Sequence, residues 1–306
     1  MRFQDFAELH GVLIRDPIED GRIHRCPTAA HPRSRNGAYL FDGRGGWVWA
    51  WDGEGRAVAF NDPNARPLTE AEQLKRNAKK QAVRDEQAEL HRKAAEWAAR
   101  LLTLAKPKEH GYLYRKGFKK ALGLVLPDGE LFIPMRDVRT NELIGAQVVK
   151  WLPEELRWEK KYLYGMRSRG ACLRIGPGRA QEQVLCEGYA TGLSIEAAIR
   201  QMKLNAAVLV CFSAHNLIEV AKRTTGRRYV IADHDPAQQD PEKARQNPGE
   251  AGQRAAIATG LGWAMPDTVG QDANDLHVAE GLMAVCALVM RARAAEAVVA
   301  TEAVPP

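Results

Sequence analysis

Three groups of acidic residues lie in the C-terminal half of the chain, two of them directly after short apolar runs and the third just before the last predicted helix. They are Glu187 after "VLC", Asp233 and Asp235 after "YVIA", and Asp272 and Asp275 in "QDAND". Carboxylates at positions i and i+2 of an extended chain project to the same side, so they repel each other unless a cation neutralises them. Oxygen ligands without His or Cys favour Mg²⁺ or Mn²⁺ over Zn²⁺. Acids at one strand end are usual in turns and helix caps, whereas three successive groups predict a divalent-metal site for phosphoryl transfer.

The elements that must position these acids are visible in the hydrophobic pattern from Gln183 onward. The predicted strands are "VLCEG", "AAVLVCF" and "RYVIAD", and the predicted helices are "TGLSIEAAIRQM", "NLIEVAKRT", "GEAGQRAAIATG" and a last helix from about Leu276. Thr191 is expected to cap the first helix. Strand–helix alternation predicts a parallel sheet covered on both faces, with ligands beyond the carboxyl ends of its strands. His234 should point away from the two aspartates beside it and is interpreted as structural.

Residues 106–180 are expected to form a smaller unit with a mixed, β-rich fold, because short strand-like runs alternate there with turn signals. Between Lys106 and Arg179 there are sixteen Lys and Arg against eight Asp and Glu, an excess larger than the net charge of +6 of the whole chain. A solvated surface would account for this charge. It also favours nucleic acid as a partner.

Residues 1–66 are rich in Gly and Trp and predict a small β unit. In "WVWAW", Trp47, Trp49 and Trp51 lie on one face of a strand by the two-residue period. We expect this face to close a small core, although exposed tryptophans also stack on nucleic-acid bases.

The same segment contains His24, Cys26 and His31, which could ligate a metal. A structural zinc site needs four ligands, usually in two close pairs, so zinc is not expected here.

Residues 67–105 contain no Gly and a single Pro at the start, and are dominated by Ala, Glu, Lys, Arg and Gln. Thr69 and Glu72 have the spacing of a capping box, and Pro107 follows the run. A long charged helix is therefore predicted between the N-terminal unit and the rest of the chain.

The composition of the 306-residue chain is that of a globular protein of about two domains. Its five cysteines have no paired spacing, which favours a reducing compartment over a disulfide framework. No signal-peptide pattern opens the sequence, and the longest apolar run, "LMAVCALVM", is too short to span a bilayer. A soluble, cytoplasmic protein without a membrane partner is expected.

Several of these motifs resemble those of a known family. "VLCEGYATGLSI", "VIADHDPA" and "QDANDLH" resemble the three acidic motifs of the Toprim domain, which primases, topoisomerases and certain nucleases share. The sequence from "GYLYRKGF" to "GACLRIG" resembles the basic subdomain that precedes Toprim in primases, particularly those of phages, plasmids and mobile elements. The resemblance covers roughly residues 107–295. It implies an α/β fold in which residues 181–306 form a Toprim-type parallel-sheet domain with a C-terminal helix, preceded by the basic subdomain, the long helix and the N-terminal β unit.

The resemblance also implies roles for individual residues. Glu187 would be the first-motif acid beside the reacting 3′-hydroxyl, Asp233 and Asp235 would bind metal, and Asp272 or Asp275 would be the third acidic position. The residues expected to contact nucleotide or nucleic acid are Lys161, as a catalytic basic residue, Lys150, Lys160, Arg167, Arg169, Arg115 and Lys116.

The sequence departs from primases of this lineage in two respects. Many begin with a zinc ribbon, whose cysteine pairs are missing here. The chain also lacks the G-x-x-x-x-G-K-[ST] motif of a P-loop helicase, so a separate replicative helicase is expected as a partner.

Together these features predict a DNA-primase-like nucleotidyltransferase that uses Mg²⁺ or Mn²⁺ to condense nucleoside triphosphates on a single-stranded DNA template. One alternative is a Toprim nuclease or strand cleaver, in which water or a tyrosine such as Tyr189 would attack. The other is a non-catalytic single-strand-binding accessory of a mobile element's replication machinery.

Overall fold

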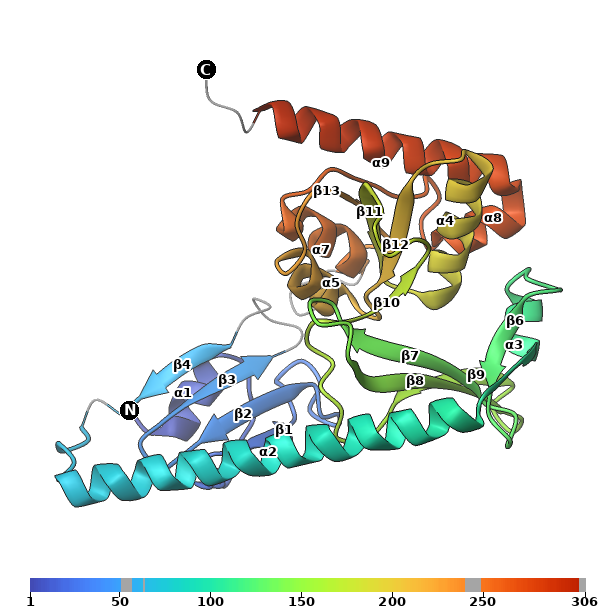
Figure 1. Cartoon of the computed structure of the whole chain (residues 1–306). Coiled ribbons are helices and arrows are strands. Elements are labelled where there is room, and N and C mark those ends of the chain that lie inside the picture. The colour runs from blue at the N-terminus through green and yellow to red at the C-terminus, as the bar shows by residue number, and fades with distance from the viewer. Residues whose placement is uncertain (51–56, 63, 240–248, 303–306) are drawn as a thin grey trace. The chain divides into compact units, whose positions relative to one another are not determined.

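The computed structural model describes residues 1–50, 57–62, 64–239 and 249–302, with side chains to residue 296 in the last helix. The chain divides into two compact units. The first contains residues 1–89 and 237–249, and the second contains residues 90–236 and 250–306. Figure 1 shows the order of the elements along the chain. No helix in the described ranges is long and apolar enough to cross a membrane.

The first unit contains a four-stranded antiparallel sheet and a short helix. Its elements are α1 (Phe3–Leu9), β1 (Ile23–Cys26), β2 (Gly37–Phe41), β3 (Gly45–Ala50) and β4 (Val58–Asn61), and the strand order is β1-β2-β3-β4. The core is aromatic, since the Phe3 and Phe41 rings stack with centroids 4.2 Å apart and Phe60 packs against both.

The tryptophans of β3 do not close this core, contrary to the prediction. Val48 is fully buried in the aromatic core, whereas Trp47 and Trp49 are only half-buried. Neighbours along a strand point to opposite faces, so both tryptophans lie on the far side of the sheet from the core. Trp51 lies outside the described residues.

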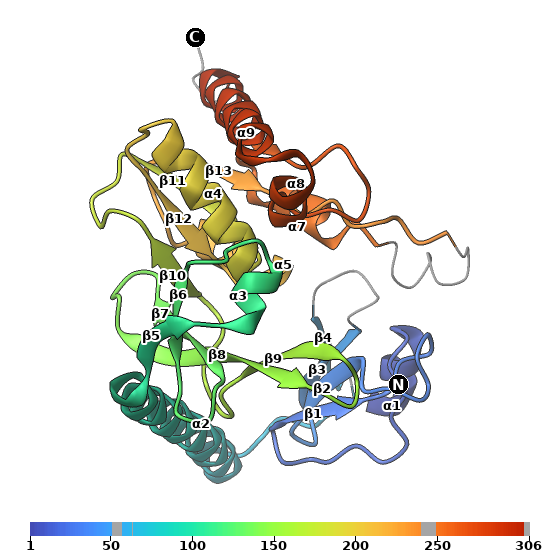
Figure 2. The same ribbon diagram turned by 90° about the vertical axis from the view of Figure 1, so that its right-hand side faces the viewer.

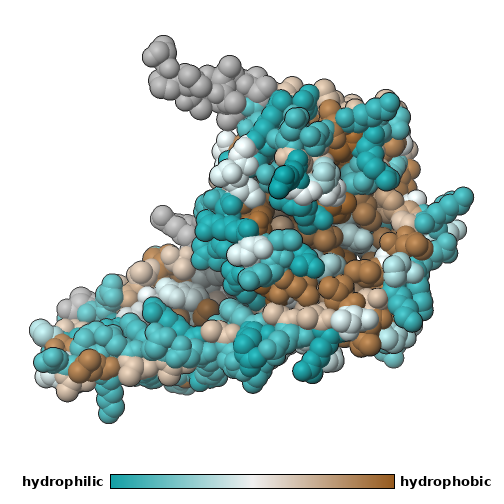
Figure 3. All heavy atoms as spheres, viewed as in Figure 1, coloured by the Kyte–Doolittle hydropathy of each residue, from teal (hydrophilic) through white to brown (hydrophobic). Residues whose placement is uncertain are grey.

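The predicted charged helix is confirmed as α2 (Glu70–Leu104). Its start has the expected capping box, because the Thr69 N–H donates to the Glu72 carboxylate at 2.9 Å and the Glu72 N–H donates to Thr69 Oγ1 at 3.3 Å. Buried residues are confined to its second half, at Ala94 and Ala98. The rest of its surface is largely hydrophilic, as Figure 3 shows.

A ten-stranded mixed sheet forms the framework of the second unit. Its main path runs β14 (Trp263–Ala264), β13 (Arg227–Ile231), β11 (Glu182–Cys186), β12 (Ala206–Val210), β10 (Ala171–Ile175), β7 (Leu131–Asp137), β6 (Leu122–Val125) and β5 (Lys106–Glu109). β8 (Leu143–Leu152) pairs with β7 and with β9 (Arg157–Tyr162). The first four strands of the path are parallel, as predicted, while β10 is antiparallel to both β12 and β7.

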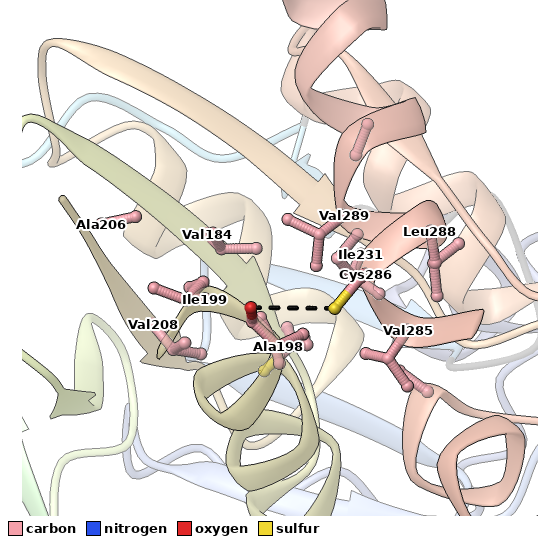
Figure 4. Packing of buried hydrophobic residues seen from close by; sticks show 14 of the residues in the cluster. Val184, Ala198, Ile199, Ala206, Val208, Ile231, Val285, Cys286, Leu288 and Val289 are labelled. Carbon is pink, nitrogen blue, oxygen red and sulfur yellow. Dashed lines mark hydrogen bonds between the residues drawn. The ribbon is translucent and has the colours of Figure 1, made fainter. Parts of the chain in front are cut away.

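Helices cover both faces of the parallel strands (Figures 1 and 2). The helices of one face are α4 (Tyr189–Gln201), α8 (Ala273–Glu280) and α9 (Leu282–Glu302), and those of the other are α5 (Ala214–Ala221) and α7 (Ala251–Thr259). Alternate residues of β11 face the two layers: Val184 packs under α4 and α9, whereas Leu185 packs under α5. Figure 4 shows the first layer, where Cys286 Sγ of α9 lies 3.8 Å from the Ala198 carbonyl of α4.

Two helix boundaries differ from the predictions. The N-cap of α4 is Gly188, and Thr191 is a buried residue inside the helix rather than its cap. The predicted last helix is two helices, α8 and α9, separated by Gly281 at φ 88°. Glycine adopts this conformation without steric cost, so the chain turns there.

Candidate active site

Glu187 lies directly after β11, at the carboxyl end of the parallel strands. Its carbonyl accepts a hydrogen bond from the Phe212 N–H at 2.8 Å, which fixes the backbone at the ends of two neighbouring strands. Burial raises the pKa of the Glu187 carboxyl to about 7, with a further contribution from the charge of Asp235, and the N–H of Ala214 at the start of α5 opposes the rise. The carboxylate is thus held in a site that resists its ionisation.

Asp233 and Asp235 follow β13, which is the parallel neighbour of β11. The register pairs Leu185 with Val230, so Glu187 and Asp233 extend beyond the same edge of adjacent strands, which are roughly 4.8 Å apart in a sheet. Burial raises the pKa of Asp233 to about 8, and the charges of Glu187, Asp272, Asp235 and Asp275 add to the rise. The three predicted groups of acids therefore act on one another electrostatically.

Asp235 also fixes the start of α7. Its Oδ2 accepts a hydrogen bond from the Gly252 N–H at 2.7 Å, and its carbonyl accepts one from Gln253 Nε2 at 2.8 Å. A Cβ atom on Gly252 would lie 2.6 Å from the Asp233 carbonyl oxygen. Only glycine lets α7 approach the acidic loop this closely.

His234 ties the acidic loop to the segment before α8, which agrees with its predicted structural role. Its Nδ1 lies 2.7 Å from the Pro266 carbonyl, which can only accept, so this nitrogen donates. Its backbone N–H donates to the Gln271 carbonyl at 3.0 Å, and its carbonyl accepts from the Gly270 N–H at 2.6 Å. These bonds bring the third acidic segment beside the second.

Asp272 and Asp275 begin α8 as a capping box. Asp272 Oδ1 accepts hydrogen bonds from the N–H groups of Asn274 at 2.7 Å and Asp275 at 2.8 Å, and Asp275 Oδ2 accepts from the Asp272 N–H at 3.3 Å. Asp275 Oδ1 also lies 3.3 Å from Lys116 Nζ. Both acids thus have structural hydrogen-bond or ion-pair partners, and their charges also raise the pKa of Asp233.

A carboxylate oxygen of Asp233 is available to bind a cation such as Mg²⁺. Asp233 Oδ1 is buried and has no hydrogen-bond partner within the described part of the chain, an arrangement that is costly unless another group binds there. Magnesium is commonly held by one or two carboxylates, with water and substrate phosphate completing its shell. Among the described residues, no three His, Cys, Asp or Glu side chains converge into a ready-made metal site.

The three possible zinc ligands of the first unit have other surroundings. His24 Nε2 lies 2.9 Å from Asp20 Oδ1. Burial raises the pKa of the Cys26 thiol to about 11, which opposes formation of the thiolate that binds zinc. His31 donates its backbone N–H to Thr28 Oγ1 at 3.2 Å.

The predicted basic residues do not all face the same way. Lys161 of β9 lies 2.9 Å from Glu159 and is 73% exposed. Lys160 lies on the opposite face of that strand, with its Nζ 5.4 Å from the centre of the Tyr112 ring.

The other predicted basic residues have a neighbouring acid or line a pocket. Lys150 lies 3.4 Å from Glu130, Arg167 lies 2.6 Å from Asp137, Arg169 lies 2.7 Å from Glu219, and Arg115 lines a pocket with Lys116. Asp137 and Glu219 are buried. Arg167 and Arg169 therefore neutralise buried acids, besides any contact with a ligand.

Tyr162 is a site residue that the sequence reasoning missed. Its hydroxyl donates to the Phe212 carbonyl at 3.0 Å, and burial followed by the charge of Glu187 raises its pKa. Phe212 itself has φ 67°, which is rare for a residue with a side chain and is found at functional sites. The alternation of β9 places Tyr162 on the same face as Lys160, opposite to Lys161, so the choice of Lys161 as the catalytic residue directed the sequence reasoning to the other face.

Comparison with known proteins identifies the part of the chain that contains these acids. Residues 182–283 match the family model of the Toprim domain. A search of curated proteins found no match to the chain. The chain thus contains a Toprim domain, which occurs in primases, nucleases and topoisomerases, and such domains generally bind Mg²⁺ through acidic residues.

Proposed function

We propose that this chain is a primase-like nucleotidyltransferase that makes short oligonucleotides on single-stranded DNA from nucleoside triphosphates, with Mg²⁺ or Mn²⁺. The observation that supports this best is that Glu187 and Asp233 lie at the ends of adjacent parallel strands and that Asp233 has a buried oxygen without a hydrogen-bond partner among the described residues. A basic unit continues the same sheet, because β10 bonds to β12 on one side and to β7 on the other. The acids can serve phosphoryl transfer, and the basic unit can hold the polyanions.

Asp233, together with Glu187 or Asp235, would hold the metal, and water and substrate phosphate would complete its shell, because no three acids converge among the described residues. The metal would neutralise charge on the attacking 3′-hydroxyl and on the triphosphate. The chain's own residues mainly position the reactants, as in other phosphoryl transfers. Burial of Glu187 and Asp233 limits the access of water to the reacting groups, and the hydroxyl of Tyr162 holds the Phe212 carbonyl beside them.

Exposed lysines would hold the template. Lys161 lies on the face of β9 opposite to Tyr162, which contacts Phe212 next to the acids, so its place is with the template rather than with the reacting nucleotide. The side chains of Lys150 and Lys161 are 58% and 73% exposed, so their charges are available to phosphates when these displace the neighbouring acids. A separate helicase would supply the single-stranded template.

One assay separates the proposal from its alternatives. The purified chain is incubated with single-stranded DNA, labelled ribonucleotides and Mg²⁺ or Mn²⁺. Labelled oligonucleotides are expected. Degraded template without synthesis would identify a nuclease, and a gel shift without either product would identify a binding protein.

Asp233→Ala is expected to abolish oligonucleotide synthesis, by at least about a hundredfold, because it removes the carboxylate with the unpaired oxygen. Binding of single-stranded DNA should be largely retained, since this acid repels phosphates. The matched control is Asp267→Ala, which removes an acid whose side chain is 87% exposed in the same part of the chain. Equal loss of synthesis and binding in Asp233→Ala would assign the acid a structural role.

A further inference from the structure

A pocket of about 320 Å³ lies between α3 (Gly111–Arg115) and α8, and Asp275 is the only one of the acids described above that lines it. The residues that matter for its chemistry are Tyr112, Arg115, Lys116, Trp158, Asn274 and Asp275. Its volume is at the lower end of the range for small-molecule sites. We call it the α3–α8 pocket.

Three buried polar atoms that belong to lining residues of this pocket have no hydrogen-bond partner in the described part of the chain. They are Tyr112 Oη, Trp158 Nε1 and Asn274 Oδ1. Tyr112 is 3% exposed and Asn274 is fully buried. Each unpaired buried group costs on the order of 1–3 kcal/mol, so three around one pocket indicate that something polar binds there.

The orientation of two of these groups is supported by their surroundings. Asn274 Nδ2 donates to the Lys116 carbonyl at 2.9 Å, so the unpaired atom of this amide is its oxygen, an acceptor. Burial raises the pKa of Tyr112 to about 12; the charge of Lys116 opposes this rise, and the charges of Asp272 and Asp275 add to it. The Tyr112 hydroxyl is therefore close enough to Lys116 and to the first turn of α8 for their charges to act on it.

The lining specifies the chemistry of a ligand. Trp158 Nε1 can only donate, Asn274 Oδ1 can only accept, and the Tyr112 hydroxyl can do both. Arg115 and Lys116 add positive charge, and the two aromatic rings offer flat apolar walls. A ligand that satisfies all of them is flat, has donors and acceptors on its edge, and is negatively charged. A nucleotide has these properties, whereas a fully ionised phosphate group would leave the Asn274 oxygen unpaired.

We propose that the α3–α8 pocket binds the base of a nucleotide whose phosphates lie toward Lys116 and the acidic site. The pocket adjoins that site, because Lys116 Nζ lies 3.3 Å from Asp275, one of the acids whose charge reaches Asp233. This inference rests on the proposed function, since it assigns a base-recognition subsite to the same reaction.

The test is equilibrium binding to the full chain, without template, by isothermal titration calorimetry. The four ribonucleoside triphosphates are compared with inorganic tripolyphosphate, which carries the charge but no base. Wild-type protein is expected to bind at least one nucleotide about tenfold more tightly than tripolyphosphate. Tyr112→Phe should lower the nucleotide affinity about tenfold and leave the tripolyphosphate affinity unchanged.

Tyr114→Phe is the matched control, because Tyr114 is on the same helix, is 61% exposed and does not line the pocket. Thermal melting checks that Tyr112→Phe is folded, and Trp158→Phe, which removes the indole N–H, provides a second variant. Equal affinity of wild-type protein for nucleotide and tripolyphosphate would overturn the proposal. So would unchanged nucleotide affinity in both folded variants, since the pocket would then hold water only.

Failure of this proposal is distinguishable from failure of the proposed function. If the protein synthesises oligonucleotides and Tyr112→Phe leaves the nucleotide KM unchanged, the proposed base subsite is wrong and the proposed function stands. If nucleotide binding depends on Tyr112 but no oligonucleotide is made, the base subsite stands and the proposed primase-like activity is wrong.

Discussion

At the scale of single residues, the acidic site is held in a state that is unfavourable without a cation. The pKa of Glu187 is raised to about 7 and that of Asp233 to about 8, in both cases mainly by burial. A carboxyl whose pKa is higher in the folded than in the unfolded protein holds its proton more tightly when folded. The free energy of unfolding is therefore highest, as far as this group is concerned, at low pH, and it falls as the pH rises through the folded pKa.

Metal-free protein should accordingly become less stable between about pH 4 and pH 8. We expect its melting temperature in EDTA to fall by several degrees across this range, because one unit of pKa shift corresponds to about 1.4 kcal/mol and 1 kcal/mol to roughly 2–4 °C for a domain of about 200 residues. Asp233→Asn should flatten the decline, and Mg²⁺ should restore stability at pH 8 in wild-type protein only. Scanning calorimetry gives the melting temperature as a function of pH for the wild-type protein in EDTA, for Asp233→Asn in EDTA, and for both proteins with Mg²⁺.

Asp267→Asn is the control for this experiment, since it changes an exposed acid. A wild-type melting temperature that is insensitive to both pH and Mg²⁺ would contradict the conclusion that these carboxyls are strained.

The positions of these acids could be predicted from the sequence because the rule behind them is local. An acid directly after an apolar strand lies at the carboxyl edge of the sheet when strands and helices alternate, so the positions of Glu187 and Asp233 followed from the order of the elements. Tyr112 and Asn274 could not be predicted in this way. Their proximity joins segments some 160 residues apart, and no periodic pattern encodes an unpaired atom.

At the scale of elements, the acidic loop depends on the helix that packs against it. α7 donates the Gly252 N–H to Asp235, and its approach leaves no room for a Cβ atom beside the Asp233 carbonyl. The start of α7 thus sets where both aspartates lie.

Gly252→Ala is expected to lower oligonucleotide synthesis about tenfold or more, although alanine favours helix formation by about 1 kcal/mol over glycine. The added methyl group must push α7 or the acidic loop away, which displaces the carboxylates. Synthesis rates and far-ultraviolet circular dichroism should show loss of activity with helix content retained.

Gly178→Ala is the matched control, because a Cβ atom there meets nothing within 4 Å and Gly178 does not adopt a positive φ. Wild-type synthesis in Gly252→Ala would show that α7 does not position the acids.

The type of each element was easier to predict than its ends. The strands β11, β12 and β13 and the helices α4, α5 and α7 follow from hydrophobic runs and helical periods. The cap of α4 was wrong because Gly188 takes the cap position through its backbone alone, which leaves Thr191 inside the helix. The break at Gly281 was missed because helical residues flank it on both sides.

At the scale of the whole molecule, positive charge is concentrated in one segment. Residues 106–179 have an excess of eight positive charges, and the rest of the chain is slightly negative. Binding of nucleic acid through this segment should release counterions and therefore depend on salt.

We expect the affinity for single-stranded DNA to fall linearly on a plot of log K against log salt concentration. Lys161→Ala should weaken binding and make the slope less steep by about 0.7, the value for one phosphate contact on a single strand. Fluorescence anisotropy over a range of salt concentrations gives both quantities. Lys75→Ala, on the exposed surface of α2 outside the basic segment, should leave the slope unchanged; an unchanged slope in Lys161→Ala would remove Lys161 from the DNA contacts.

The antiparallel strand β10 has a mechanical consequence. It is bonded to β12, beside the acids, and through Ala171 and Cys172 to β7 of the basic segment. A rigid-body rotation of these two parts away from each other would have to break the backbone hydrogen bonds between β10 and its neighbouring strands. Under the proposed function, a bound strand would therefore enter and leave without separation of these two parts.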